Sequence, residues 1–179
     1  MTAIATSDTD STGLHAAEWS APAFSSREFR NAMGQFASGV VVISVSAPNG
    51  AHAMTANAFM SGSLEPPLVV ISVATTAKMH HLLTAEGGFG VSILASTQEK
   101  DSNHFAGRHS EGHAPQFDLL GETPVLSGAV VRLAAKTLHS YPCGDHTLFV
   151  GRVTTLETRV EEGARPLVYY KGGYRALVS

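Results

Sequence analysis

The chain has 179 residues, of which 44% are hydrophobic, and its 12 basic and 15 acidic side chains give a net charge of −3 with neutral histidines. This length predicts one domain with a sizeable apolar core. The weak negative charge argues against nucleic-acid partners and against a polybasic membrane surface. The single cysteine, Cys143, excludes an intramolecular disulfide and fits a reducing compartment. No apolar run reaches the roughly 18–20 residues of a membrane span, and the polar N-terminus does not resemble a secretory signal, so we expect a cytoplasmic protein without a membrane partner.

The N-terminal region divides into a tail and a first helix. Residues 1–23 are rich in Thr, Ser, Asp and Ala, which predicts a disordered tail ahead of a folded domain over 24–179. Ser25 and Glu28 have the S-x-x-E spacing of a helix-capping box. Apolar side chains then recur at helical spacing and predict one apolar helix face: Phe29, Ala32, Met33 and Phe36. Gly39 supplies the expected stop.

The remainder of the chain is dominated by short β patterns. Val40–Val45 is a β-branched run that predicts a strand, and Pro48-Asn49-Gly50 predicts a turn. Further strands are expected near 51–59, 67–74, 89–95, 129–139, 147–157 and 166–170. Short helices are expected near 76–85 and 97–106, the second opened by another S-x-x-E capping box over 96–99. This balance predicts a mainly β barrel or sandwich with short peripheral helices. Residues 107–124 predict a long loop that is either mobile or works as a lid.

Several familiar sites are excluded by their spacing. The only G-x-G, Gly88-Phe89-Gly90, has Ile93 in place of the third glycine and precedes a strand, so a Rossmann dinucleotide site is not expected. The nine histidines include His104, His109 and His113, but no H-E-x-x-H pattern, and we expect no metal site. Cys143 is too close in sequence to His146 for a catalytic dyad, and no serine lies in a G-x-S-x-G elbow.

Three blocks carry the functional signal. The stretch Ala53–Val73 places small, hydroxylated and amide residues between two apolar runs. Such a surface suits a flat ligand with a phosphate tail, although by itself it also fits a loop between strands. The other two blocks are Gly144-Asp-His-Thr-Leu-Phe-Val-Gly-Arg-Val153 and Pro166-Leu-Val-Tyr-Tyr-Lys-Gly-Gly-Tyr174. In this order and spacing the three resemble the flavin reductase-like family of FMN-binding split barrels, over about residues 24–177.

The resemblance is strongest to the reductase components of two-component flavin monooxygenases. It implies an antiparallel Greek-key split β-barrel with short peripheral helices. It also implies a homodimeric NAD(P)H:flavin oxidoreductase that reduces FMN or FAD and releases the reduced flavin to a separate monooxygenase. NADH or NADPH would be the co-substrate, bound without a Rossmann fold.

The same resemblance implies the flavin-binding residues. Lining of the isoalloxazine ring is expected from Met54, Thr55, Asn57 and Ala58. The ribityl and phosphate side is expected along Ser61, Ser63 and Leu64, and the adjacent strand would contribute Ser72, Val73 and Ala74. Lys78, at the start of a short helix, would neutralise the phosphate, and the flavin tail would lie near His104 and Phe105.

The nicotinamide is expected to lie near the second and third blocks. By resemblance, His146 contacts or orients the nicotinamide ring, and aromatic residues of the C-terminal block, including Tyr170 and Tyr174, flank it or close the pocket. The alternative for His146 is a hydrogen bond that closes a strand turn. Two other functions stay open: a tight flavin-binding electron carrier, and a non-catalytic dimeric module that binds flavin, haem or another planar ligand. The Gly144-Asp-His146 turn favours the enzyme.

Overall fold

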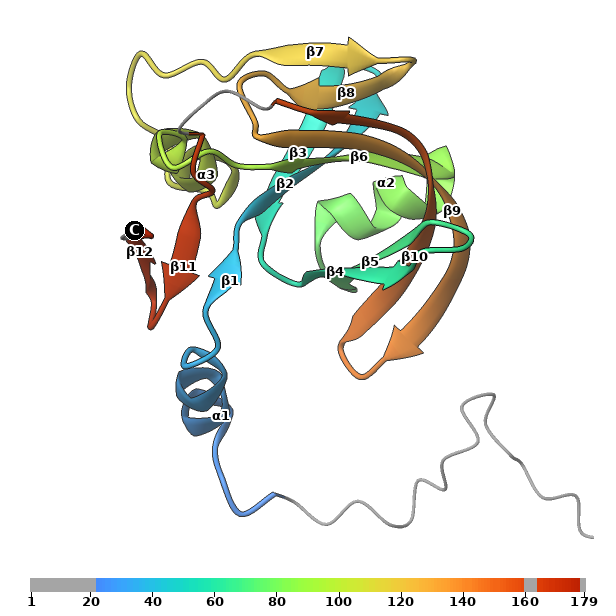
Figure 1. The fold of residues 1–179 in the computed structure, drawn as a ribbon. Coiled ribbons are helices and arrows are strands. Elements are labelled where there is room, and N and C mark those ends of the chain that lie inside the picture. The colour runs from blue at the N-terminus through green and yellow to red at the C-terminus, as the bar shows by residue number, and fades with distance from the viewer. Residues whose placement is uncertain (1–21, 160–163, 178–179) are drawn as a thin grey trace, which may run out of the picture.

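A computed structural model describes residues 22–159 and 164–177 (Figure 1). The helices are α1 (Ser26–Met33), α2 (Lys78–Glu86) and α3 (Glu99–Phe105). The strands are β1 (Ser38–Gly39), β2 (Val41–Ala47), β3 (Gly50–Ala56), β4 (Phe59–Ser63), β5 (Leu68–Ala74), β6 (Gly88–Ile93), β7 (Phe117–Leu120), β8 (Thr123–Leu126), β9 (Val131–Cys143), β10 (His146–Thr158), β11 (Val168–Tyr170) and β12 (Gly173–Arg175). Residues 1–21, the bulk of the expected tail, lie outside the described residues.

Seven strands form one curved sheet in the order β3-β2-β6-β9-β10-β5-β4. Every pairing in the sheet is antiparallel. A smaller sheet joins β1, β11 and β12, and β7 pairs with β8. Figure 1 shows the long strands β9 and β10 curving along one side of the barrel. The expected mainly β split barrel with short peripheral helices is confirmed.

The apolar pattern of the strands explains this arrangement. In β5, alternate residues face the main core, which contains Val69, Ile71 and Val73. β2 is buried on both faces, because Ile43 lies in the main core and Val42 in a second cluster with Leu94, Leu126 and Leu167. A strand covered on both faces reads as a continuous apolar run instead of an alternating one. Helix α2 closes the main core by burying Met79 and Leu83.

The two edges of the seven-stranded sheet are consecutive in the sequence. β3 and β4 are at opposite ends of the strand order, yet only Asn57 and Ala58 separate them along the chain. The sheet must therefore curl until its edges meet at this two-residue joint. Because β3 and β4 do not pair with each other, each presents a row of backbone groups without a strand partner. The expected single strand over 51–59 was wrong in this respect, since it is broken at the joint.

Helix α1 is shorter than the sequence pattern indicates. The capping box is confirmed: the Glu28 N–H donates to Ser25 Oγ at 3.2 Å, and the Ser25 N–H donates to Glu28 Oε2 at 2.8 Å. The helix ends at the Gly34 cap, and the expected stop, Gly39, lies in β1 instead. Figure 1 shows α1 standing away from the barrel, and none of its residues is buried. Its apolar face has no covering element among the described residues.

The second expected capping box was wrong. Helix α3 begins at Glu99 with Gln98 as the N-cap residue, and no side chain caps its first turn. The Gln98 amide is used elsewhere: Oε1 accepts from the Ala95 N–H at 3.0 Å, and Nε2 donates to the Ser127 carbonyl at 2.9 Å. Gln98 thus joins the start of α3 to the segment after β8.

The loop expected over 107–124 was only partly right, because strands begin at Phe117. Its second half contains β7 and the start of β8, which form a hairpin across the end of the barrel (Figure 1). Leu120 and Val125 from this hairpin pack with Ala134 in a third buried cluster. Arg132 of β9 holds the hairpin through an ion pair with Asp118 of β7, and its second ion pair is with Glu157 of β10. Strand β12, at the C-terminal end, was also missed.

Candidate active site

The two-residue joint between the sheet edges is the centre of the candidate site. Its flanks are held on both sides. The Thr55 hydroxyl of β3 donates to the Ser102 carbonyl of α3 at 2.8 Å, and the Ser72 N–H of β5 donates to the Ala58 carbonyl at 3.1 Å. The joint therefore has a fixed position between α3 and β5. The Asn57 side chain is exposed beside it.

Two cavities adjoin this joint on the side of the C-terminal hairpin. The smaller, of about 170 Å³, is lined by residues of β3, α3 and β12 that include Thr55, Ser102 and Tyr174. The larger, of about 590 Å³, lies between α1 and the β11–β12 turn. Asn57 and Tyr169 line both cavities, so the two are neighbours.

The hairpin β11–β12 braces these cavities. The Tyr174 hydroxyl lies 2.8 Å from Ser102 Oγ, which anchors β12 to α3. On the other side, the Tyr170 hydroxyl donates to Gln35 Oε1 at 3.2 Å, and the Lys171 N–H donates to the Gly34 carbonyl at 2.9 Å. Tyr170 thus does not line the larger cavity, but it holds Gln35, which does.

A second group of expected site residues gathers at the C-terminal end of β5, close to the joint. His146, the first residue of β10, pairs directly with Ala74, and the Thr75 N–H donates to the Asp145 carbonyl at 3.0 Å. The His146 Nδ1 lies 2.7 Å from Asp145 Oδ1. The hydrogen bond from His146, and then its charge, lower the pKa of Asp145. With Nδ1 engaged, Nε2 of the partly exposed imidazole is the nitrogen left for a ligand.

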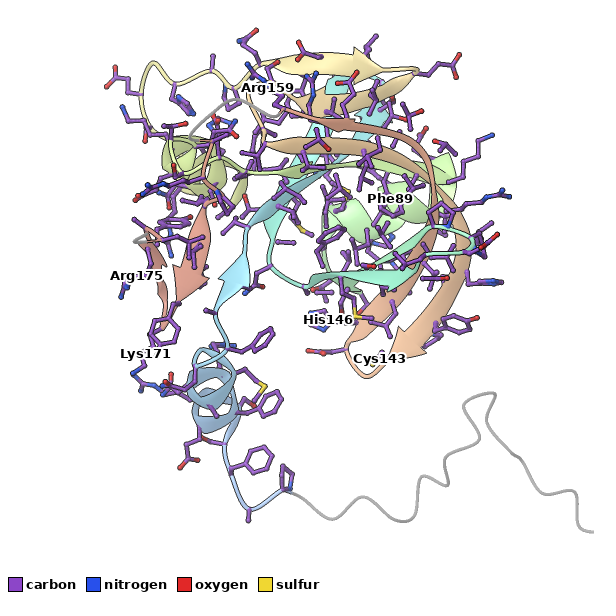
Figure 2. All side chains as sticks on the ribbon, viewed as in Figure 1. Phe89, Cys143, His146, Arg159, Lys171 and Arg175 are labelled. Carbon is purple, nitrogen blue, oxygen red and sulfur yellow. The ribbon has the colours of Figure 1, made fainter. Side chains whose placement is uncertain are left out.

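This pairing brings together in space two blocks that are separate in the sequence. The Gly144-Asp-His146 turn and the 53–78 segment are far apart in sequence, yet β10 and β5 run side by side from His146 to Arg152. Figure 2 places His146 and Cys143 at the tip of the β9–β10 hairpin, well away from Lys171 beside α1. The expected residues therefore form two groups on either side of the joint.

Lys78 and Ser72 belong to the group around β5. Lys78 opens α2, and the N-cap residue Ala77 has no side chain that could cap the first turn. The free N–H groups of that turn and the Lys78 ammonium together suit an anion. The pKa of His52, on β3, is lowered by burial and then by the positive charge of Lys78. Lys78 therefore lies within electrostatic reach of the β3 edge.

The remaining expected residues differ in what their side chains can reach. The Val73 side chain is buried in the core, and Met54 packs against that core, so they can offer a ligand mainly backbone groups. On β4, Ser61 is exposed, Ser63 is partly exposed, and Leu64 follows the strand with 90% of its surface exposed. Phe105 packs on the second core cluster and contacts Phe117 edge to face at 5.7 Å between ring centroids.

His104 belongs to a cluster of histidines at the end of α3. Its Nδ1 lies 3.5 Å from that of His109, and its ring meets the edge of the His113 ring. Burial lowers the pKa of His104, and the charges of His109 and His113 lower it further, against an opposing effect of Asp101. His113 is held by Asp101 through a 2.8 Å contact. Within 22–159 and 164–177, no three His, Cys, Asp or Glu residues are arranged to hold a metal ion.

Sequence reasoning missed the cations that border the cavities. Arg30 lines the larger cavity and Arg108 the smaller one. Arg30 reads as an ordinary basic residue in the last turn of a helix, and Arg108 as a loop residue. No local pattern distinguishes either of them, because each reaches its cavity only through the packing of α1 and α3 near β11 and β12.

Comparisons with known proteins agree with this geometry. Residues 33–178 match the family model described as flavin reductase like domain. An NADH-dependent flavin reductase of a Rhodococcus species is 45% identical over 151 residues, covering 83% of this chain and 84% of the relative. The reductase component of 4-hydroxyphenylacetate 3-monooxygenase from Thermus thermophilus is 45% identical over 150 residues, covering 84% of this chain and 95% of the relative.

A solved structure of the flavin reductase PheA2 in its native state has a TM-score of 0.82 and 38% identity, covering 87% of this chain and 100% of that one. The split-barrel fold of this chain is thus shared with a solved flavin reductase. The chain belongs to the flavin reductase-like family. None of the helices in the described part of the chain is long and apolar enough to cross a membrane.

Proposed function

We propose that this protein is an NADH-dependent flavin reductase that supplies diffusible reduced flavin to a partner monooxygenase. One observation carries the proposal: the segment typical of the family's flavin site forms the joint between two unpaired sheet edges, and β5 brings it beside His146. Backbone groups without a strand partner along two sheet edges would suit a flavin that enters and leaves. The names of the relatives from Rhodococcus and Thermus support NADH as reductant and a monooxygenase as recipient.

The protein's part in the reaction is to bind and orient. A bound flavin supplies the chemistry by accepting a hydride from the nicotinamide, and this transfer requires no acid, base or nucleophile from the chain. The unpaired backbone groups near Thr55, Asn57 and Ala58 would hold the flavin ring. Lys78 and the uncapped first turn of α2 would hold its phosphate, and His146 Nε2 would orient the nicotinamide. Orientation of this kind contributes a large share of the acceleration of such transfers.

Steady-state NADH oxidation with and without added FMN, FAD and riboflavin tests the proposal. We expect slow oxidation until free flavin is added and many turnovers afterwards. Turnover that ignores added flavin, with a flavin that never exchanges, would instead identify a tight electron carrier. A protein that binds flavin but oxidises neither NADH nor NADPH would be a non-catalytic module.

Replacement of His146 separates its two possible roles. In His146→Ala we expect kcat/KM for NADH to fall about 5- to 150-fold, the range expected for loss of one well-placed contact. Because His146 pairs with Ala74, the dissociation constant for FMN is measured in parallel. His81→Ala, at an exposed histidine of α2, is the matched control. A variant that lowers the melting temperature and both affinities together would assign His146 a structural role.

Lys78→Ala should show the opposite pattern. We expect weaker FMN binding with little change in turnover at saturating flavin. The penalty should be smaller for riboflavin, which lacks the phosphate that Lys78 would neutralise. Equal weakening for FMN and riboflavin would contradict the phosphate role.

We also propose that the protein is a homodimer in the cytoplasm. Phe24 and Phe29 stack at 5.8 Å on the exposed side of α1. On the outer face of the sheet, Met60, Val70 and Val150 form one cross-strand row. A second copy would cover both apolar surfaces. Light scattering should give twice the monomer mass, and Met60→Lys should shift it towards the monomer, whereas a fully active wild-type monomer at micromolar concentration would contradict the dimer.

A further inference from the structure

A polar pair lies inside the apolar barrel, between α2 and the start of β10. His80 Nε2 lies 2.9 Å from the hydroxyl oxygen of Thr147, and the imidazole meets the ring of Phe149 edge to face at 5.4 Å between centroids. Thr147 and Phe149 are both buried, and Phe149 belongs to the main core. A polar pair in such surroundings adds little net stability. It restricts the relative position of the helix and the strand, because a hydrogen bond is directional.

The second ring nitrogen of His80 is buried without a partner. Nδ1 has no hydrogen bond to any of the residues that the structure describes. When Nε2–H donates to Thr147, Nδ1 is an unpaired acceptor, and in the other tautomer Nδ1–H is an unpaired donor. Either case carries a desolvation cost that an apolar side chain of similar size would avoid. Stability alone therefore does not account for a histidine at this position, whereas the Nε2 contact across the core does.

Two attachments link the segment between β5 and the first turn of α2 to the start of β10. At Thr75, the N–H donates to the carbonyl of the residue before His146 at 3.0 Å. At His80, the ring contacts the residue directly after His146. Lys78 and the uncapped first turn of α2 lie between these two attachments. The start of α2 and the turn that carries His146 are therefore held to each other at both ends of the segment.

We propose that His80 is a positioning residue for hydride transfer, which holds the start of α2 at a fixed place relative to His146. This role rests on the proposed function, in which Lys78 binds the flavin phosphate and His146 orients the nicotinamide. The contact between His80 and Thr147 sets where these two groups stand relative to each other. Transfer between two bound rings is sensitive to their alignment, since a misplacement of about 1 Å can cost about 100-fold in rate. Loss of the contact should therefore slow the transfer more than it weakens the binding of either ligand.

The experiment replaces the polar pair by an apolar pair of similar shape, His80→Leu/Thr147→Val, in the full chain. Single-turnover reduction of FMN by NADH should slow at least about tenfold, while the dissociation constant for FMN and the KM for NADH change by less than about threefold. The melting temperature should be unchanged or higher, because both partners are replaced together and the unpaired nitrogen is removed. Thr154→Val is the matched control, since the Thr154 hydroxyl of β10 donates to the Ala134 carbonyl at 3.2 Å and not to α2.

Amide substitutions separate the two nitrogens of the ring. In His80→Gln the terminal amide reaches about as far as Nε2, so it keeps a hydrogen-bond partner for Thr147 and should retain most of the wild-type rate. In His80→Asn the amide stands near the place of Nδ1, so the rate should fall as in the apolar variant. This second pair of variants serves as the test if the double variant does not fold.

The outcomes distinguish the positioning role from the proposed function. An unchanged rate in the apolar double variant, or equal rates in His80→Gln and His80→Asn, would overturn the positioning role while the wild-type protein stays active. A melting temperature that falls together with the rate and both affinities would also overturn it, because the pair would then be an ordinary structural contact. Wild-type protein that oxidises neither NADH nor NADPH with any added flavin would overturn the proposed function instead.

Discussion

The barrel interior and the side facing α1 use the same residue type for opposite purposes. Phe89 of β6 is fully buried (Figure 2), and its ring fills the space left by Gly151, where a Cβ atom would stand 2.6 Å from it. Phe36, after α1, leaves most of its ring exposed at a cavity. The barrel is stabilised by contacts among its own strands. On the side of α1, aromatic and cationic side chains are exposed instead of packed against other residues. Such exposed surfaces are where ligands and partners bind.

Truncation of the two phenylalanines should show the largest contrast. We expect Phe89→Ala to lower the free energy of unfolding by about 3–5 kcal/mol, because it leaves a cavity in a packed core. Phe36→Ala should change it by no more than about 0.5 kcal/mol, because most of its ring is already exposed. Urea denaturation of both variants checks this. Similar stability losses would show that Phe36 is covered in the assembled protein.

The hydroxyl of Tyr174 tests how firmly the cavity side is joined to the barrel. Tyr174→Phe removes its hydrogen bonds to Ser102 Oγ at 2.8 Å and Asn103 Oδ1 at 3.4 Å and keeps the ring. We expect a loss of about 0.5–1.5 kcal/mol in the free energy of unfolding. Hydrogen exchange should rise in β11 and β12 and stay unchanged in β9 and β10. Faster exchange throughout the barrel would contradict the separation of the two regions.

The smallest expected effect is a pH dependence from His104. Its pKa in the folded protein is below the ordinary value of 6.5, so the unfolded chain binds the proton more readily. Stability should therefore be lost as the pH falls below about 6.5 towards the folded-state pKa. His104→Gln should reduce the fall in melting temperature between pH 7.5 and 5.5. His52, whose pKa is also lowered, keeps part of the dependence, and an unchanged profile in the variant would contradict the assignment.

The sequence predicted the parts of the fold whose pattern is set locally. The alternation in β5 and the continuous apolar run of β2 identify buried strands, since burial on one or both faces imposes these patterns. The β7–β8 hairpin was missed because Gly, His and Pro nearby read as a loop, and its burial depends on Ala134 of a distant strand.

For the candidate site, the sequence predicted which segments contribute residues but not how these segments are arranged in space. The resemblance named Asn57, Ala58 and His146 as expected site residues, but the pairing of His146 with Ala74, which brings it near the joint, depends on the sheet register. Arg30 and Arg108 reach their cavities through packing of α1 and α3 near the C-terminal hairpin. No periodic pattern of residues in the sequence indicates that these helices pack near the hairpin. A single sequence therefore predicts the strands more fully than the surface on which a ligand would bind.

The short joint between β3 and β4 also limits how far the two edges of the sheet can separate. From Ala56 to Phe59 there are three Cα–Cα steps, which span at most about 11 Å however the chain bends. The two edges cannot part by more than this at the joint, and farther along the strands no covalent link of this kind joins them within the described part of the chain. Any widening must therefore be angular, with Asn57 and Ala58 as the pivot and the free ends of the strands moving farthest. Residues inserted between Asn57 and Ala58 would lengthen the joint and leave the paired strands intact. The largest possible separation of the two edges would then depend only on the length of the joint.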